Sequence, residues 1–210
     1  MSKKQISIID YGASNMMNVQ HAFEYMGVKV TIASTPEEIM LADRLVFPGV
    51  GSFPEAMFQI EQKGLTSAII ESAKNSPFLG ICLGMQLMLT DSSEFEKTKG
   101  LGLISGNVCA LPKANNKKQN LIIPNVGWSE ITYNESQKSI FADVPNKSAF
   151  YFVHSFHAEL EDSSHQLATT MFDEFSITAM IQKENIIGCQ FHPEKSGKLG
   201  LQLINNFLNI

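Results

Sequence analysis

Short, continuously apolar segments alternate with amphipathic helical patterns through the first hundred residues of this 210-residue chain. Strands that are apolar on both faces are typical of a parallel sheet covered by helices on each side. We expect such strands at 5–10, 28–33, 44–47 and 78–82. We expect the intervening helices at 18–26, from Thr35 onward, at 54–63 and at 65–74. The alternation predicts an α/β fold with a central, mostly parallel sheet flanked by helices.

After about Gly100 the pattern changes, because predicted strands follow one another with little helix between them. These strands are expected at 122–131, 149–154, 166–171, 176–181 and 186–191. An amphipathic helix over 199–208 closes the chain. We expect the strands of this half to form an antiparallel extension of the same sheet, so that residues 1–210 make a single domain.

The composition excludes several classes of protein. Lys and Arg number 16 against 21 Asp and Glu, whereas a nucleic-acid-binding protein concentrates positive charge on one face. Hydrophobic residues make up 44% of the chain, too many for a disordered protein. No apolar run reaches the about 18 residues of a membrane span, and the amino terminus lacks a signal-peptide pattern. Three widely spaced cysteines indicate a reducing cytoplasm rather than a disulfide framework.

The pentapeptide Gly-Ile-Cys-Leu-Gly at 80–84 is the most informative motif. It places Cys82 between a predicted strand and a helix that begins near Leu83. A nucleophile elbow has this arrangement, since its sharp turn leaves no room for bulky neighbours. The sulfur would then lie at the carboxyl edge of the sheet, where open α/β folds bind ligands. The alternative is a buried structural cysteine, which is the interpretation we favour for Cys109 and Cys189.

His192 is the candidate base for this thiol. It ends a predicted strand and is followed by Pro193 and Glu194. Proline keeps the preceding residue extended, so the side chains of His192 and Glu194 can lie on one side. A thiol, an imidazole and an orienting carboxylate would form a Cys–His–Glu triad. His154 also ends a predicted strand and is the second candidate base. The other histidines are expected to be solvated: His21, His157 and His165.

A second glycine-bearing loop, Pro48-Gly49-Val50-Gly51, follows a predicted strand at the same edge of the sheet. Its backbone amides could donate to a developing oxyanion, although the loop could equally be a simple turn. No Walker motif is present, because the required lysine is missing. A zinc site made by Cys82, His192 and Glu194 is another interpretation, but neither an HExxH nor a paired CxxC motif accompanies it.

Two motifs, 80–86 (Gly-Ile-Cys-Leu-Gly-Met-Gln) and 191–194 (Phe-His-Pro-Glu), resemble the signatures of class-I, triad-type glutamine amidotransferases. Within that family the chain is similar, nearly end to end, to the HisH group. The further matching segments occur in the same order, at 9–12, 48–53, 123–124 with 127–128, 151–155 and 192–196. The resemblance implies a flavodoxin-like single domain that hydrolyses glutamine without a metal or other cofactor.

The resemblance implies a role for each matching residue. Cys82 would attack the carboxamide of glutamine, His192 would carry the thiol proton to the departing ammonia, and Glu194 would hold the His192 ring. The backbone amides of Val50 and Leu83 would stabilise the oxyanion. The remaining residues expected at the glutamine site are Gly49, Gly51, Gln86, Glu94, His154, Ser155 and Phe156.

The resemblance also implies a heterodimer with a HisF-type (β/α)8 barrel. That subunit would receive the ammonia through an internal channel and make imidazole glycerol phosphate and AICAR in histidine biosynthesis. Asn15, Trp128 and Lys195 are expected at the contact, although Trp128 could instead be ordinary core. Departures from the family pattern, such as Met17 where arginine is usual, leave a second acceptor open. In that alternative, the chain would supply ammonia to a HisF-like partner that amidinates surface sugars.

Two other classes of protein share part of this pattern. An α/β-hydrolase with a cysteine nucleophile has the same GxCxG turn, but its acid usually precedes its histidine, whereas Glu194 follows His192. A catalytically inactive paralogue would have no need to keep Cys82, His192 and Glu194 together.

Overall fold

The computed structural model describes residues 5–12, 16–134 and 139–210. A nine-stranded sheet runs through them in the order β2-β1-β3-β4-β13-β12-β11-β8-β9. Its parallel part consists of β1 (Gln5–Ile9), β2 (Lys29–Ala33), β3 (Leu45–Gly49), β4 (Phe78–Cys82) and β13 (Ile186–Cys189). Its antiparallel part consists of β8 (Asn125–Tyr133), β9 (Ala149–His154), β11 (Gln166–Phe172) and β12 (Phe175–Lys183).

This arrangement confirms the predicted α/β class, with a helix-flanked parallel part and an antiparallel extension of the same sheet. One strand is placed differently, because β13 was expected in the antiparallel part and instead pairs in parallel with β4. β4, which ends at Cys82, therefore lies between β3 and β13 in the middle of the sheet. The carboxyl ends of these three strands meet at one edge.

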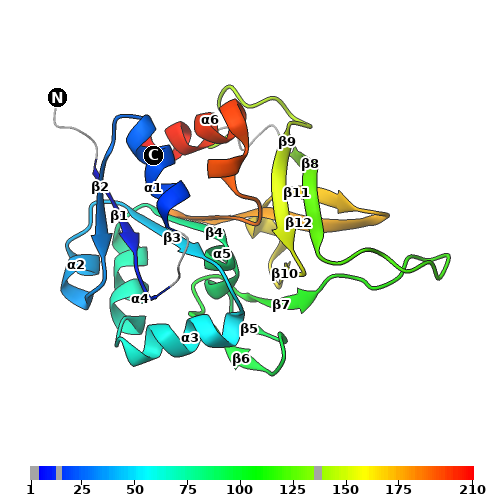
Figure 1. Cartoon of the computed structure of the whole chain (residues 1–210), viewed down its shortest axis with the longest axis horizontal. Helices are drawn as coiled ribbons and strands as arrows, with labels where there is room; N and C mark the ends of the chain where they lie inside the picture. Colours follow the sequence, from blue (N-terminus) through cyan, green and yellow to red (C-terminus); the bar gives the residue numbers. More distant parts are fainter. Residues whose placement is uncertain (1–4, 13–15, 135–138) are drawn as a thin grey trace.

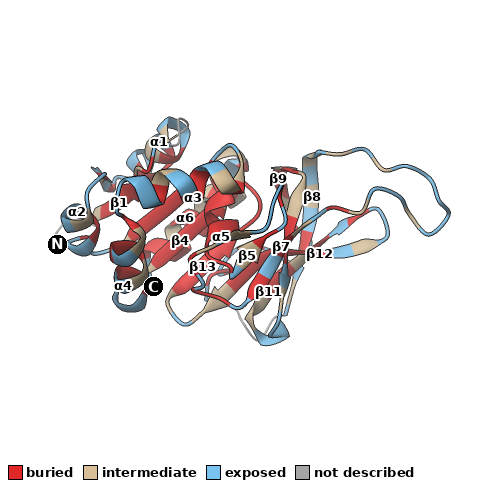
Figure 2. Ribbon diagram, turned by 90° about the horizontal axis from the view of Figure 1, so that it is seen from below, coloured by how far each residue is buried: buried red, intermediate tan, exposed pale blue. Residues whose placement is uncertain are grey.

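Helices cover both faces of the parallel strands (Figure 1). On one face lie α1 (Met17–Tyr25) and α6 (Gly197–Leu208), whose buried side chains share one apolar cluster. On the other face lie α2 (Pro36–Met40), α3 (Phe53–Gln62), α4 (Thr66–Asn75) and α5 (Leu83–Leu87). Figure 2 shows the parallel strands buried between these layers, while the helices have one exposed side. No helix in the described part of the chain is both long and apolar enough to cross a membrane.

Local sequence decides where several of these helices begin. The Thr35 side chain accepts a hydrogen bond from the Glu38 N–H at 3.3 Å, and the Glu38 carboxylate accepts one from the Thr35 N–H at 3.1 Å. This capping box satisfies two helix-end donors, and Pro36 supplies the fixed backbone angle of the first turn. The predicted helix start at Thr35 is therefore confirmed.

A second, four-stranded sheet, β10-β7-β5-β6, was not expected from the sequence. It consists of β5 (Asp91–Ser92), β6 (Thr98–Lys99), β7 (Gly106–Ala110) and β10 (Phe156–Leu160). β9 ends at His154 and β10 begins at Phe156, so the chain passes between the sheets at Ser155. Within β10, His157 is buried opposite Cys109, and the expectation that His157 is solvated is wrong. His21 is exposed as expected, and His165 is half-buried.

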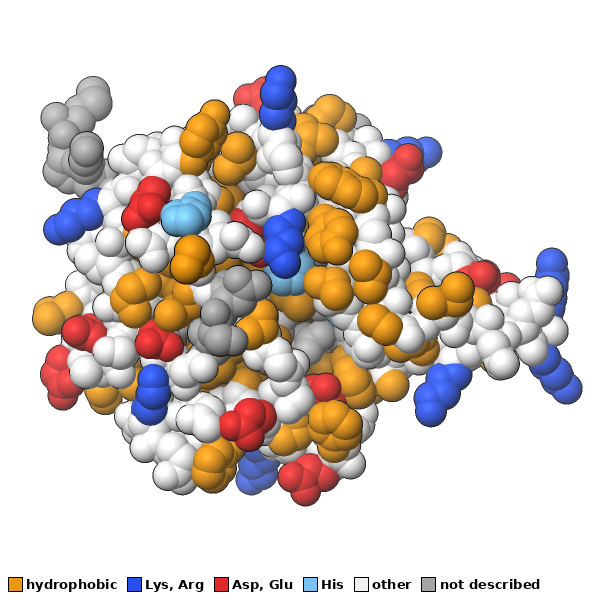
Figure 3. All heavy atoms as spheres, viewed as in Figure 1, with side chains coloured by type: hydrophobic (Ala, Val, Ile, Leu, Met, Phe, Trp, Pro, Cys, Tyr) orange, Lys and Arg blue, Asp and Glu red, His pale blue; other side chains and the backbone are white. Residues whose placement is uncertain are grey.

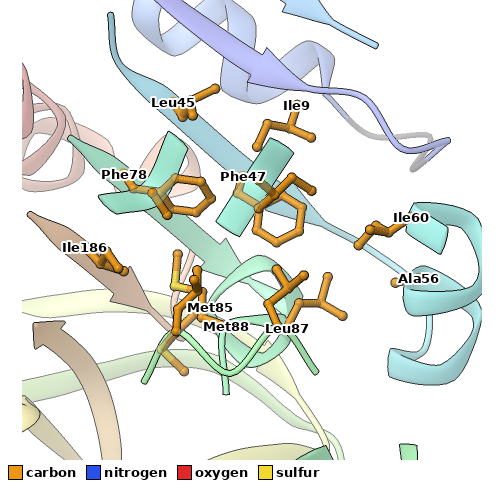
Figure 4. Packing of buried hydrophobic residues seen from close by; sticks show 14 of the residues in the cluster. Ile9, Leu45, Phe47, Ala56, Ile60, Phe78, Met85, Leu87, Met88 and Ile186 are labelled. Carbon is orange, nitrogen blue, oxygen red and sulfur yellow. The ribbon is translucent and has the colours of Figure 1, made fainter. Parts of the chain in front are cut away.

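The apolar core directly under α5 depends on two glycines that pair across the sheet, Gly80 of β4 and Gly188 of β13. A Cβ on Gly80 would lie 2.4 Å from Met88 Cε, and a Cβ on Gly188 would lie 2.4 Å from Met85 Cγ. The missing side chains let α5 pack against the strands, with Met85 and Met88 beside Phe47 and Phe78 (Figure 4). All five residues of α5 are buried. The helix that follows Cys82 is thus anchored in the core.

Candidate active site

Cys82 is the last residue of β4, and α5 begins at the next residue. Its backbone has φ 56° and ψ −113°, a left-handed region that is strained for a residue with a side chain. The half-buried sulfur lies 3.9 Å from the Val153 carbonyl oxygen and 3.7 Å from Nε2 of Gln190. The structure therefore has the sharp strand-to-helix turn that the glycines around Cys82 predict.

His192 and Glu194 form the next layer behind the sulfur. His192 follows the end of β13 by three residues and enters the 3₁₀ turn η3 (Pro193–Lys195). Its Nδ1 lies 2.8 Å from Oε1 of Glu194, and its ring lines the same cleft as Cys82. The His192 N–H donates to the Tyr151 carbonyl at 2.9 Å, which holds this segment against β9. The structure thus brings the three residues of the predicted triad together, with Cys82 and His192 in one cleft and Glu194 bonded to the His192 ring.

The electrostatics favour a proton on His192. Burial of the ring lowers the pKa of His192, but the hydrogen bonds and charges of Cys82 and Glu194 outweigh burial and raise this pKa to about 9. The Glu194 side chain is only 3% exposed, and its Oε2 has no hydrogen-bond partner among the described residues. At neutral pH the imidazole can hold a proton taken from the thiol.

A cleft of about 370 Å³ opens beside Cys82, a volume typical of small-molecule sites. Its lining residues are Gly49, Val50, Gly51, Cys82, Leu83, Gln86, Glu94, Pro124, Val153, His154, Ser155, Phe156, His192 and Lys195. Every residue expected to bind glutamine or the oxyanion is among them, together with Lys195. The loop after β3, the start of α5 and the junction of the two sheets meet here. Glu194 lies behind His192, against a smaller cavity.

His154 is the less suitable of the two candidate bases. Its Nδ1 donates to the Phe156 carbonyl at 2.8 Å, so Nε2 accepts from the Asn125 amide at 3.1 Å. Burial lowers the pKa of His154 to about 4, which keeps the ring neutral at physiological pH. Both ring nitrogens are therefore engaged away from Cys82.

Glu94 connects the cleft to the start of α3. Its Oε2 accepts a hydrogen bond of 2.7 Å from the N–H of Phe53, the first residue of that helix. The side chain is buried, and burial raises the pKa of Glu94 although this hydrogen bond opposes the shift. The carboxylate thus lines the cleft from a position held by a backbone donor.

Gln190 was not expected from the sequence, yet it is fully buried and contacts both Cys82 and Gln86. The only signal was its position two residues before His192, and its contacts with β4 and α5 arise from tertiary packing. Cys189 is buried core, as expected. Cys109 is only half-buried and its sulfur lies 3.5 Å from a Glu159 carboxylate oxygen, so the core interpretation of Cys109 holds only in part.

The residues predicted at a partner contact have different outcomes. Asn15 lies outside the described residues. Lys195 is half-buried at the cleft. Trp128 is 59% exposed on β8, beside Val126 at 56%, and its ring packs edge-on against Tyr151 at 6.1 Å. Core packing of Trp128 is therefore excluded. In the view of Figure 3, hydrophobic side chains gather over the region of β8 and β9, near a lysine or arginine and a histidine.

The described residues contain no group of three or more His, Cys, Asp or Glu side chains arranged to hold a metal ion. All three cysteines are free thiols.

Comparisons with known proteins agree with this geometry. Residues 7–210 match the family described as glutamine amidotransferase class-I. The chain is 46% identical to imidazole glycerol phosphate synthase subunit HisH 1 of Legionella pneumophila, covering 98% of this chain and 99% of that protein. It is 41% identical to subunit HisH of Caldanaerobacter subterraneus, covering 96% of each.

Two solved structures share the fold. PurLQS of Thermotoga maritima gives a TM-score of 0.71 at 17% identity, over 99% of this chain and 98% of that one. The glutaminase domain of CTPS from Trypanosoma brucei gives a TM-score of 0.64 at 16% identity, over 99% of this chain and 94% of that one.

Proposed function

The chain belongs to the class-I glutamine amidotransferase family, and on that premise we propose that it is the glutaminase subunit of an imidazole glycerol phosphate synthase in histidine biosynthesis. The HisH relatives support the assignment, because their similarity covers nearly the whole length of both chains. The observation that carries the chemistry is the placement of Cys82 and His192 in one cleft, with Glu194 hydrogen-bonded to the His192 ring.

The reaction follows from that placement. The Cys82 sulfur attacks the carboxamide carbon of glutamine while His192 takes the thiol proton. His192 then gives this proton to the amide nitrogen, the C–N bond breaks, ammonia leaves, and a glutamyl thioester remains on Cys82. Water attacks the thioester as His192 accepts one of its protons, which returns to the sulfur as glutamate departs. Glu194 holds the ring and stabilises its positive charge during both steps.

The tetrahedral intermediates carry negative charge on the former carbonyl oxygen. Leu83 is the first residue of α5, so its N–H has no acceptor within the helix and can donate to that oxygen. Val50, at the facing wall of the cleft, supplies the second donor from its backbone. The flanking Gly49 and Gly51 carry no side chains that would obstruct the approach of the substrate.

The rest of the cleft suits the two ends of glutamine. Glu94 supplies the negative charge for the α-ammonium group. Gln86 lies at the α-carboxylate end and shapes the wall there, since the NH₂ group of its amide already donates to the Phe156 carbonyl and to Gln190. Residues at the junction of the two sheets complete the wall of the site: His154, Ser155 and Phe156. Since His154 is neutral, it contributes hydrogen-bonding and packing rather than charge.

We place the acceptor chemistry on a HisF-type (β/α)8 barrel that forms a heterodimer with this chain in the cytoplasm. The exposed Trp128 and Val126, close to the cleft residue Pro124 in sequence, supply the apolar surface for that contact. Asn15 and Lys195 belong to the same proposed interface. The ammonia would pass from Cys82 into the barrel without meeting solvent, which keeps it unprotonated.

The test uses the complex reconstituted with a HisF-type barrel and its ribonucleotide substrate. Cys82→Ala should abolish glutamine-dependent synthesis but leave synthesis from added ammonia at the wild-type rate. Cys109→Ala, which removes a half-buried thiol elsewhere, is the matched control and should keep both activities. Glutamate release by folded Cys82→Ala would disprove the triad assignment. Activity only with a surface-sugar substrate and a HisF-like partner would instead establish the second acceptor.

A further inference from the structure

Two buried amides connect the wall of the cleft to the sulfur of Cys82. Nε2 of Gln86 lies 3.1 Å from the Phe156 carbonyl oxygen and 2.9 Å from Oε1 of Gln190. Nε2 of Gln190 in turn lies 3.7 Å from Sγ of Cys82. Gln190 is fully buried, and Gln86 is nearly so. The three contacts therefore form one continuous chain that solvent does not interrupt.

A backbone group sets the direction of this chain. The Phe156 carbonyl can only accept, so Gln86 must turn its NH₂ group toward it. The second N–H of that group points to Gln190, which must therefore present its oxygen to Gln86. Gln190 is left with its NH₂ group facing the sulfur. Reversing either amide would place two acceptors or two donors face to face in a buried site. Gln190 therefore presents a hydrogen-bond donor to the Cys82 sulfur at any pH.

We propose that Gln190 is a further catalytic residue, whose side-chain N–H donates to the Cys82 sulfur and stabilises its negative charge while His192 holds the proton. This inference rests on the proposed glutaminase function and assigns a residue to it. A hydrogen bond from a neutral donor to an anion is stronger than one between neutral groups. The Gln190 amide therefore stabilises the ionised sulfur more than the neutral thiol. Gln190 also has no ionisable proton, so it stabilises the thiolate without competing with His192 as a base.

The two amides belong to different elements that meet beside the cleft. Gln86 comes from α5 and Gln190 from the segment between β13 and His192. The Phe156 carbonyl orients Gln86, and Gln86 in turn orients the Gln190 amide that donates to the sulfur. Phe156 belongs to the wall assigned to glutamine binding. The nucleophile is therefore held by two groups from one segment, His192 through its imidazole and Gln190 through its amide.

The test replaces Gln190 and measures the reactivity of the sulfur directly. Gln190→Met keeps the volume but removes the donor, and Gln190→Glu keeps an acceptor for Gln86 while removing the donor. We expect both variants to slow alkylation of Cys82 by iodoacetamide at pH 7, and to lower the kcat of glutamine hydrolysis in the complex, by about 10- to 100-fold. Peptide mass spectrometry identifies the alkylated cysteine.

The matched control is Gln166→Met, which removes a half-buried amide hydrogen-bonded to Thr178 at 2.9 Å in the same large sheet. It should alkylate and turn over like the wild type. If Gln190→Met does not fold, as judged by circular dichroism, the same measurements on Gln190→Glu decide the matter. Wild-type alkylation and kcat in a folded Gln190 variant would overturn the inference. Because alkylation needs no glutamine turnover, a wild-type protein without glutaminase activity would count against the proposed function alone.

Discussion

A Cβ atom on Gly84 would lie 1.8 Å from the carbonyl oxygen of Phe47, so the first turn of α5 touches the backbone of β3 directly. A Cβ on Gly49 would likewise lie 2.8 Å from the Gly84 nitrogen. This close packing holds the loop after β3 beside the start of α5. The two backbone segments proposed to bind the oxyanion, at Val50 and Leu83, therefore depend on the absence of side chains at neighbouring positions.

Gly84→Ala should destabilise the protein strongly. The new methyl group would overlap a backbone oxygen that cannot move without shifting β3, and overpacking of this kind costs about 1–3 kcal/mol or more. Urea unfolding measures the loss. The control is Gly64→Ala, at φ +65° with nothing within 4 Å, which isolates the cost of backbone strain. A Gly84→Ala protein as stable as the Gly64→Ala control would contradict the close contact.

Glu194→Gln should lower the pKa of His192 from about 9, since it removes one of the two charges that raise this pKa. The titration of the His192 ring, followed by NMR, should move toward lower pH. We expect kcat to fall at least tenfold, because the imidazolium loses its buried counter-charge. Glu159→Gln, which removes an exposed carboxylate 3.8 Å from His157, is the control. An unchanged His192 titration would show that Glu194 does not act electrostatically.

His154 should make the protein sensitive to mild acid. Its pKa is about 4 in the folded state against 6.5 when unfolded, because burial disfavours the charged ring. Between these values the unfolded chain binds a proton that the folded chain does not, so stability falls as the pH falls. The loss from this residue is on the order of 3 kcal/mol between pH 6.5 and pH 4. In His154→Gln that part of the pH dependence should disappear from urea-unfolding curves, and identical pH dependence in both proteins would refute the prediction.

Trp128→Ala should weaken the proposed barrel complex at least tenfold, since exposed tryptophans that become buried often dominate binding energy. The side chain is 59% exposed in the free subunit, so its removal should change stability little. Isothermal titration calorimetry with the partner measures the effect. The control is Phe58→Ala, which truncates an aromatic residue that is 53% exposed on α3. Equal affinities of the two variants would place the interface elsewhere.

The strand-to-helix turn at Cys82 was predictable from sequence because the residues that determine it are neighbours in the chain. The strand at 78–82 has the bounds expected from its apolar run, and the helix begins at Leu83 as expected. Apolar periodicity and turn residues act over a few neighbours, so they can be recognised without knowing the fold. The same holds for the capping box at Thr35 and for the proline that follows His192.

The second sheet was not predictable for the opposite reason. β5 and β6 have two residues each, too short for any periodic pattern, and they exist as strands because β5 pairs with β6 and with β7. His157 lies on β10, whose pairing with β7 joins segments about 48 residues apart in the chain and accompanies the burial of its side chain. β13 likewise reads as one more strand of the antiparallel half, and only its hydrogen bonds to β4 make it parallel.

The sequence alone determined the α/β class and the turn at Cys82, since each is encoded in short runs of residues, and it predicted the triad of Cys82, His192 and Glu194. Tertiary structure alone decided that Gln190 reaches the sulfur, that both ring nitrogens of His154 are engaged, and that Trp128 is exposed. The physical reason is that hydrogen-bond direction and burial depend on groups far apart in the chain, which meet only when the sheets pair and the helices pack.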